Sequence, residues 1–180
     1  MIMLVEFYRG DEGRLCGWIA SPPHRRPFQG STMAAGRDLP HDLTQFTIER
    51  VLEIRDGFWG LLAHGGWFAS VPGRRPTPQG RAIVRAHHAA LVAVEGVVNS
   101  HYLAWKRREA TPLTPELDVM YARWLALRDG ERLALEWPVR PLSGHDVRCR
   151  LGTDRRRAHC VGLRSDARNR TVLSPPKQLR

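Results

Sequence analysis

The chain has 180 residues, with 28 Lys or Arg against 18 Asp or Glu, and its formal net charge is +10. The length suits one domain, and 42% hydrophobic residues with six tryptophans can build a core without a metal or a disulfide. No apolar run approaches the roughly 20 residues of a membrane-spanning helix, and the first residues lack a secretory leader, so we expect a cytoplasmic protein without membrane contact.

The first element expected along the chain is a β-hairpin. Residues 2–9 and 14–20 are rich in β-branched and aromatic residues, and the glycine-flanked pair Asp11-Glu12 between them is typical of a turn. Residues 21–37 hold three prolines and two glycines without an apolar period, which predicts a loop.

Helices are expected over most of the middle of the chain. A first helix is predicted to begin near Asp38, as the N-cap, because apolar residues from Leu43 to Phe58 recur at a spacing near 3.6, and Gly57 is expected to break or bend it. A short helix ending at the paired glycines 65–66 follows. The clearest pattern covers residues 79–108, which are predicted to form one long helix, and another helix is expected to begin at Thr114.

A last strand is expected over residues 131–139, where Leu133, Leu135 and Trp137 alternate with polar or small residues. The predicted fold class is therefore α+β. It has a small antiparallel sheet, made of the N-terminal hairpin and this strand, packed with three or four helices. Residues 1–139 are expected to form this single domain.

Positive charge is concentrated at the end of the sequence. Residues 140–180 contain 11 bases and three acids, a sum of +8, whereas residues 1–139 contain 17 bases and 15 acids, a sum of +2. Low aromatic content and the lack of an apolar period predict a basic, disordered C-terminal tail over 140–180. A domain at +2 gives no evident electrostatic reason to bind nucleic acid.

The best candidate site lies at the start of the first predicted helix. His41, Gln45 and Glu49 are spaced to form a polar ridge on one helix face, with Asp42 beside the first of them. The spacing resembles that of zinc-binding helices, in which two histidines four residues apart hold the ion and a neighbouring acid is the base. His41, Asp42 and Glu49 are therefore the catalytic candidates. The alternative is an exposed polar face, with Asp42 favoured by the helix dipole.

A metal site is a weaker prediction, because Gln45 is a poor zinc ligand. Its candidate ligands are His41 and Glu49, joined by His87 if the two helices lie side by side. The alternative assigns His87 and His101 to the apolar stripe of the long helix, as hydrogen-bonded structural histidines. No cofactor is expected.

Other motifs have simpler explanations. The glycines between residues 57 and 66 fit neither phosphate-binding pattern and indicate close helix packing. Cys16 is predicted to be a small buried apolar residue. Cys149, His159 and Cys160 do not have zinc-finger spacing, and three cysteines cannot all pair, which indicates reduced thiols.

Two patterns resemble a family of small uncharacterised bacterial proteins. They are LPHDLxxFxxExxL followed by GFWGxxAxG between residues 39 and 65, and GxxLxLEWP over residues 130–138. The resemblance covers roughly residues 1–139 and implies a shared fold without an established function. Members of the family often carry histidine where this chain has Gln45, so the resemblance makes a metal role weaker here.

No complete catalytic constellation is found, so the leading hypothesis is a non-enzymatic cytoplasmic binding or accessory protein, with a protein as one type of partner. One alternative is a metal-dependent, hydrolase-like enzyme with a degenerate HDxxQ helix site. Another is weak, non-specific association of the 140–180 arginines with nucleic acid. An arginine-rich ending without a period also arises when a frame is misread in GC-rich DNA.

Overall fold

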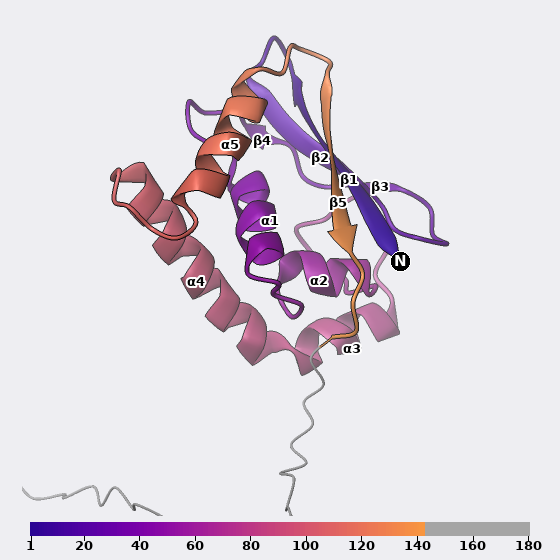
Figure 1. Cartoon of the computed structure of the whole chain (residues 1–180). Helices are drawn as coiled ribbons and strands as arrows, with labels where there is room; N and C mark the ends of the chain where they lie inside the picture. The colour runs from indigo at the N-terminus through magenta and orange to yellow at the C-terminus, as the bar shows by residue number, and fades with distance from the viewer. Residues whose placement is uncertain (143–180) are drawn as a thin grey trace, which may run out of the picture. The chain divides into compact units, whose positions relative to one another are not determined.

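The structure, a computed structural model, describes residues 1–142, and its sheet is built around the N-terminal hairpin. Strands β1 (Ile2–Gly10) and β2 (Leu15–Ser21) pair antiparallel, so the predicted hairpin is confirmed. Strand β5 (Arg132–Pro138) pairs antiparallel with the other edge of β1, which confirms the last predicted strand (Figure 1).

Two short strands extend the sheet beyond β2. They are β3 (Phe28–Gln29) and β4 (Met33–Ala34), both antiparallel to β2, and the strand order is β3-β2-β1-β5. The prediction of a loop over 21–37 was therefore incomplete. Two-residue strands are too short to show an alternating pattern, and only their pairing with β2 defines them.

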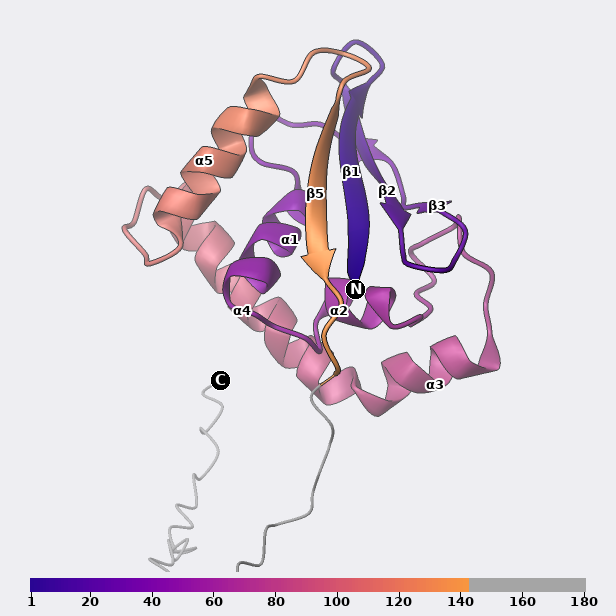
Figure 2. The same cartoon turned by 45° about the vertical axis from the view of Figure 1, so that its right-hand side comes forward.

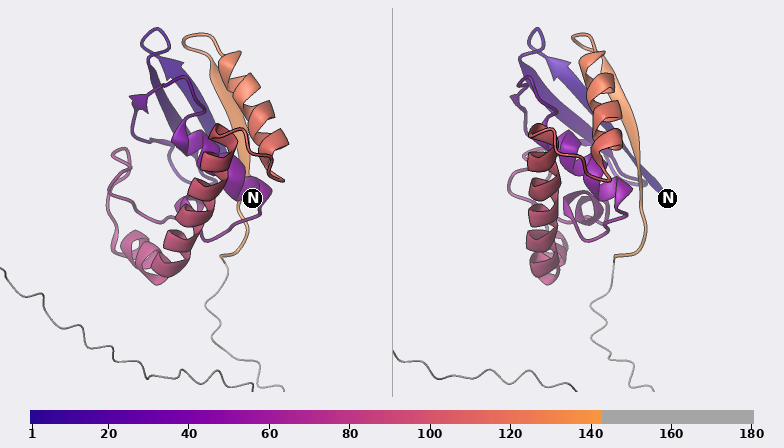
Figure 3. Two further views of the ribbon diagram at one scale, coloured as in Figure 1. Left: turned by 90° about the vertical axis from the view of Figure 1, so that its left-hand side faces the viewer. Right: turned by 60° about the vertical axis from the view of Figure 1, so that its left-hand side comes forward.

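Five helices gather on one face of the sheet (Figures 2 and 3). They are α1 (His41–Val51), α2 (Phe58–Ala63), α3 (Pro78–Ala86), α4 (His88–Lys106) and α5 (Thr114–Leu125). Helix α1 lies against the sheet, and α4 covers α1 from the outside (Figure 3). The α+β class is confirmed.

The core lies between the sheet and the helices. The alternating residues of β1 and β5 point into it, and they are Met3, Val5, Phe7, Leu133, Leu135 and Trp137. Trp59 of α2 sits at its centre, with its ring 5.6 Å from Phe7 and 5.2 Å from Phe46 between ring centroids. Such edge-to-face aromatic contacts add to the stabilisation from burial alone.

Helix α1 is shorter than predicted at both ends. It begins at His41 after Pro40, and it ends at Val51, whose side chain is exposed. The N-cap position is Pro40 and not Asp38, and the Asp38 carboxylate lies 2.7 Å from the Lys106 ammonium. Phe58 belongs to α2.

The predicted helix over 79–108 is wrong in one respect, because it is two helices. The helical path breaks at His87, which has φ −110° and ψ 15°. This break explains why five helices are present where three or four were expected. In the part of the chain that the structure describes, no helix is long and apolar enough to cross a membrane.

Candidate functional site

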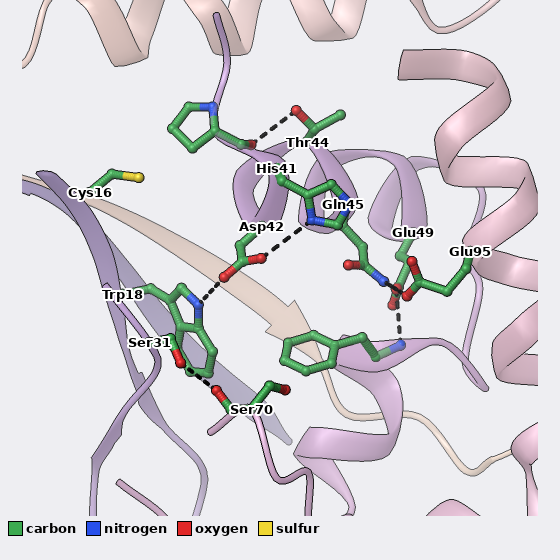
Figure 4. A network of polar contacts seen from close by, with 12 residues as sticks. Cys16, Trp18, Ser31, His41, Asp42, Thr44, Gln45, Glu49, Ser70 and Glu95 are labelled. Atoms are coloured by element: carbon green, nitrogen blue, oxygen red, sulfur yellow. Dashed lines mark hydrogen bonds and ion pairs between the residues drawn. The ribbon is translucent and has the colours of Figure 1, made fainter. Parts of the chain in front are cut away.

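The polar ridge of α1 runs from the surface into the core (Figure 4). The His41 side chain is 44% exposed, whereas Gln45 and Glu49 are buried. The alternative of an exposed polar face is therefore wrong for Gln45 and Glu49. A buried carboxylate is costly unless it is hydrogen-bonded, so the partners of Glu49 indicate its role.

Glu49 binds the N-terminus of α2. Its Oε1 accepts a hydrogen bond from the Phe58 N–H, and its Oε2 accepts one from the Trp59 N–H, each at 3.0 Å. These N–H groups have no partner within α2, and Gly57 has no side chain that could cap them. A Cβ at Gly57 would collide with the Glu49 carboxyl group, so glycine at this position leaves the space in which Glu49 caps α2.

Gln45 joins Glu49 to a second carboxylate on α4. Its amide nitrogen donates to Glu49 Oε1 at 2.9 Å and to Glu95 Oε1 at 2.6 Å. Burial raises the pKa of Glu49 to about 8, against the opposing effect of its three N–H donors. Gln45, which stands where a zinc-binding helix has its second histidine, thus links α1 and α4 and, through Glu49, α2.

Asp42 is the polar contact between α1 and the sheet. Its Oδ2 accepts a hydrogen bond of 2.7 Å from the buried Trp18 indole N–H. Its Oδ1 lies 3.5 Å from His41 Nδ1, and this contact raises the pKa of His41 although burial opposes the rise. The catalytic candidates therefore share one helix, and His41 contacts Asp42, but Glu49 has separate partners on α2.

His87, the third metal candidate, lies at the break between α3 and α4, with its Nδ1 3.0 Å from the Ile83 carbonyl oxygen. Among residues 1–142 there is no group of three His, Cys, Asp or Glu side chains positioned to hold a metal ion. The catalytic and metal assignments of His41, Asp42, Glu49 and His87 stay predictions.

Space beside Glu49 is limited. A pocket of about 40 Å³ is bordered by Glu49, Gly60 and Trp137. One water molecule needs roughly 10–15 Å³ of such space, so this pocket has room for a few waters and not for a substrate.

The remaining candidates have mixed outcomes. Cys16 is buried as predicted, and burial raises the pKa of its thiol to about 11. His101 is partly buried, but its Nδ1 has no hydrogen-bond partner in the described chain. Cys149, His159, Cys160 and all of the predicted tail after residue 142 lie outside the described residues.

A second surface, which we call the arginine face, was not predicted from the sequence. It is formed by the β2–β3 loop, the loop before α3, and α3 itself, which lie on the same side of the molecule (Figure 2). Its members are Arg25, Arg26, Arg74, Arg75, Arg81 and Arg85. All are exposed except Arg74, which is half-buried.

Two arginines of this face lie over aromatic rings. The Arg74 guanidinium carbon lies 5.0 Å from the Phe28 ring centroid, and that of Arg81 lies 5.0 Å from the Trp67 ring centroid. The Arg74 guanidinium also donates to the Leu62 carbonyl at 3.0 Å, and the Arg74 backbone carbonyl accepts a hydrogen bond from the Trp67 indole N–H at 3.1 Å. Arg74 therefore holds the two loops and the end of α2 together.

Positive charge on this face is unbalanced. None of its six arginines forms an ion pair with an acid in residues 1–142. Residues 1–142 carry 18 bases and 15 acids, so without these six the remainder has 12 bases and 15 acids, a charge of −3. Burial, and the nearby charge of Arg25, lower the pKa of Arg74.

The sequence did contain a signal for the arginine face. No acid occurs in residues 13–37 or in residues 57–94. A charge sum over 1–139 conceals this, because acids elsewhere in the domain cancel the arginines arithmetically while lying away from them in the structure.

Comparison of this chain with known protein families, with curated proteins and with solved structures gives no match. The resemblance to the small bacterial family therefore stays a prediction, and the function must be argued from the residues.

Proposed function

We propose that this protein is a non-enzymatic binding protein that captures an anionic partner on the arginine face. The observation that carries the proposal is the set of six arginines without an ion pair among the described residues, on a domain whose remainder has a charge of −3. A concentrated charge of one sign attracts partners of the opposite sign and speeds their association.

The contacts of the polar ridge support binding over catalysis. Glu49 caps α2, Gln45 bridges two carboxylates and Asp42 holds Trp18, so each has a partner that stabilises the fold. A general base needs instead to be within reach of a substrate proton. The cytoplasmic location expected from the composition belongs to the same proposal.

Retention on immobilised heparin tests the proposal, with the full chain used throughout. The triple variant Arg26→Gln, Arg75→Gln, Arg85→Gln is expected to elute at lower salt than the wild type. The matched control changes three exposed arginines outside the face to Gln, and these are Arg107, Arg123 and Arg128. Both variants lose three charges and keep residues 143–180. Elution of the two variants at the same salt concentration would refute a role for the arginine face.

A further inference from the structure

The chemistry of the arginine face restricts the kind of anion that it suits. All six bases are arginines, whose planar guanidinium groups bind phosphate oxygens in pairs and stack on flat rings. The whole chain has 26 arginines and only two lysines, so the absence of lysine from this face follows the composition of the chain. The guanidinium groups nevertheless suit a partner that has both phosphates and planar groups.

The face lacks the apolar anchors that other partners need. Large exposed hydrophobic side chains occur in the described chain, but none lies in residues 21–31 or 64–86, which form this surface. A membrane-binding surface inserts apolar side chains among its bases, and a protein interface centres on apolar or aromatic anchors. Their absence favours a hydrophilic phosphate polymer.

The stacked pair of Arg81 and Trp67 offers a platform for a base. Trp67 is half-buried, its backbone N–H donates to the Gly80 carbonyl at 3.1 Å, and Arg81 is the next residue of α3. The backbone contact thus positions the ring, and the exposed Arg81 guanidinium lies over it, with its carbon 5.0 Å from the ring centroid. A guanidinium held in this way can stack with an unpaired nucleobase on its free side.

The loops that carry the other arginines are already ordered by the fold. Gly73 N–H donates to the Gln29 carbonyl at 3.2 Å, which joins the loop before α3 to β3. At Gly65 the left-handed φ of +101° favours glycine, and the Arg25 guanidinium lies against this residue. A surface that is ordered before binding loses less conformational entropy on binding.

We infer that the arginine face binds single-stranded nucleic acid, with backbone phosphates on the exposed arginines of the two loops and of α3 and one base stacked on the Arg81 guanidinium. This inference rests on the proposed function and narrows its anionic partner. A single strand is favoured over a duplex because only unpaired bases have a free ring face.

Conservative replacement of Arg81 separates stacking from charge. The Arg81→Lys variant keeps the charge and loses the planar group, with Arg123→Lys as the control on α5. Binding of a fluorescein-labelled oligothymidylate of 12 nucleotides is measured by anisotropy, and heparin retention is measured on the same full-length proteins. We expect Arg81→Lys to weaken oligonucleotide binding at least about fivefold, the low end for loss of one stacked base, with heparin elution unchanged. Thermal unfolding of each variant checks that the fold is intact.

The salt dependence gives a second measurement. For single strands the slope of log K against log salt changes by about 0.7 per phosphate contact, so the triple Gln variant of the face should lower it by about 2. Its matched control should leave the slope unchanged.

The outcomes separate this inference from the proposed function. Equal oligonucleotide affinity of Arg81→Lys and wild type, or tighter binding of a duplex of the same length, would overturn the single-strand inference while heparin binding by the face stands. Failure of the face variants to alter either oligonucleotide or heparin binding would overturn both.

Discussion

Replacing Glu49 by glutamine tests the role of the most deeply buried carboxyl group in the polar ridge. The two side chains have nearly the same shape, but an amide has only one accepting atom. In either amide orientation, one of the Phe58 and Trp59 N–H groups would face the NH₂ group, because the two now bind different oxygens of Glu49. At pH 7 a Glu49 with a pKa of about 8 is mostly protonated, but its hydroxyl oxygen can still accept a hydrogen bond, which an amide nitrogen cannot. A buried donor left without a partner costs about 1–3 kcal/mol, so we expect Glu49→Gln to lower the free energy of unfolding by that amount at pH 7.

The same variant also changes the pH dependence of stability. The pKa of Glu49 is raised from 4.5 to about 8, so between these values the folded protein holds a proton that the unfolded chain releases. The contribution of Glu49 to stability is therefore complete below pH 4.5 and is lost as the pH rises towards 8. Its slope is at most about 1.4 kcal/mol per pH unit. Glu49→Gln cannot titrate, so this component of the slope should disappear.

Urea unfolding, followed by tryptophan fluorescence at several pH values from 5 to 9, measures both effects. The exposed Glu109→Gln is the control, and it should change the free energy of unfolding by less than about 0.5 kcal/mol. If Glu49→Gln were as stable as the wild type at every pH, Glu49 would not cap α2. A stability difference that stayed constant with pH would instead refute the raised pKa.

Three further predictions concern packing, the indole contact and the tail. Gly60→Ala should destabilise the fold by more than 1 kcal/mol in thermal melts, because its Cβ would overlap the backbone of the preceding loop. Gly96 lies in open space on α4, so Gly96→Ala should stabilise the fold by about 1 kcal/mol. Equal effects of the two variants would contradict the packing described for α2. Asp42→Ala leaves the buried Trp18 indole N–H unpaired and should cost about 1–3 kcal/mol in urea unfolding, and an unchanged midpoint would rule this contact out as stabilising. Deleting residues 143–180 removes ten bases and three acids, so we expect DNA binding to become weaker and less dependent on salt in anisotropy titrations. The melting temperature should not change. Unchanged DNA binding would show that these residues do not contribute to it.

The long strands were predictable because they bury one face only. In β1 and β5 every second side chain enters the core, and this alternation is visible in the sequence without any knowledge of the partner strand. Strands β3 and β4 have two residues each, and they exist because the β2 edge offers them hydrogen bonds. Only a tertiary contact defines them.

The break at His87 was not predictable from the local pattern. Apolar spacing continues through residues 79–108, and no glycine or proline marks the junction. The two helices pack against different parts of the fold. Gly80 of α3 lies against the backbone of Gly65, whereas α4 packs on α1. These separate tertiary contacts direct the two helices differently and override the continuous local preference.

The sequence identifies the polar ridge of α1 as a set of residues, but the burial of Gln45 and Glu49 was not predicted. A glutamate among polar neighbours on a helix is usually exposed. Glu49 can be buried because it accepts hydrogen bonds from two backbone N–H groups, nine and ten residues further along the chain. Nearly every residue has a backbone N–H, so the sequence does not show which ones will bind a given side chain. The glycine at position 57 was the available hint, since it leaves the space that the carboxyl group occupies.

The pairing of β1 with β5 has a consequence for synthesis of the protein. Strand β1 forms within the first ten residues, yet its second edge gains a partner only when residues 132–138 have left the ribosome. Until then the unpaired backbone of β1 and its apolar side chains are open to other chains, as is typical of aggregation-prone intermediates. A ribosome that stalls before β5 would therefore release a product dependent on chaperones, although this product contains every helix found in residues 1–142.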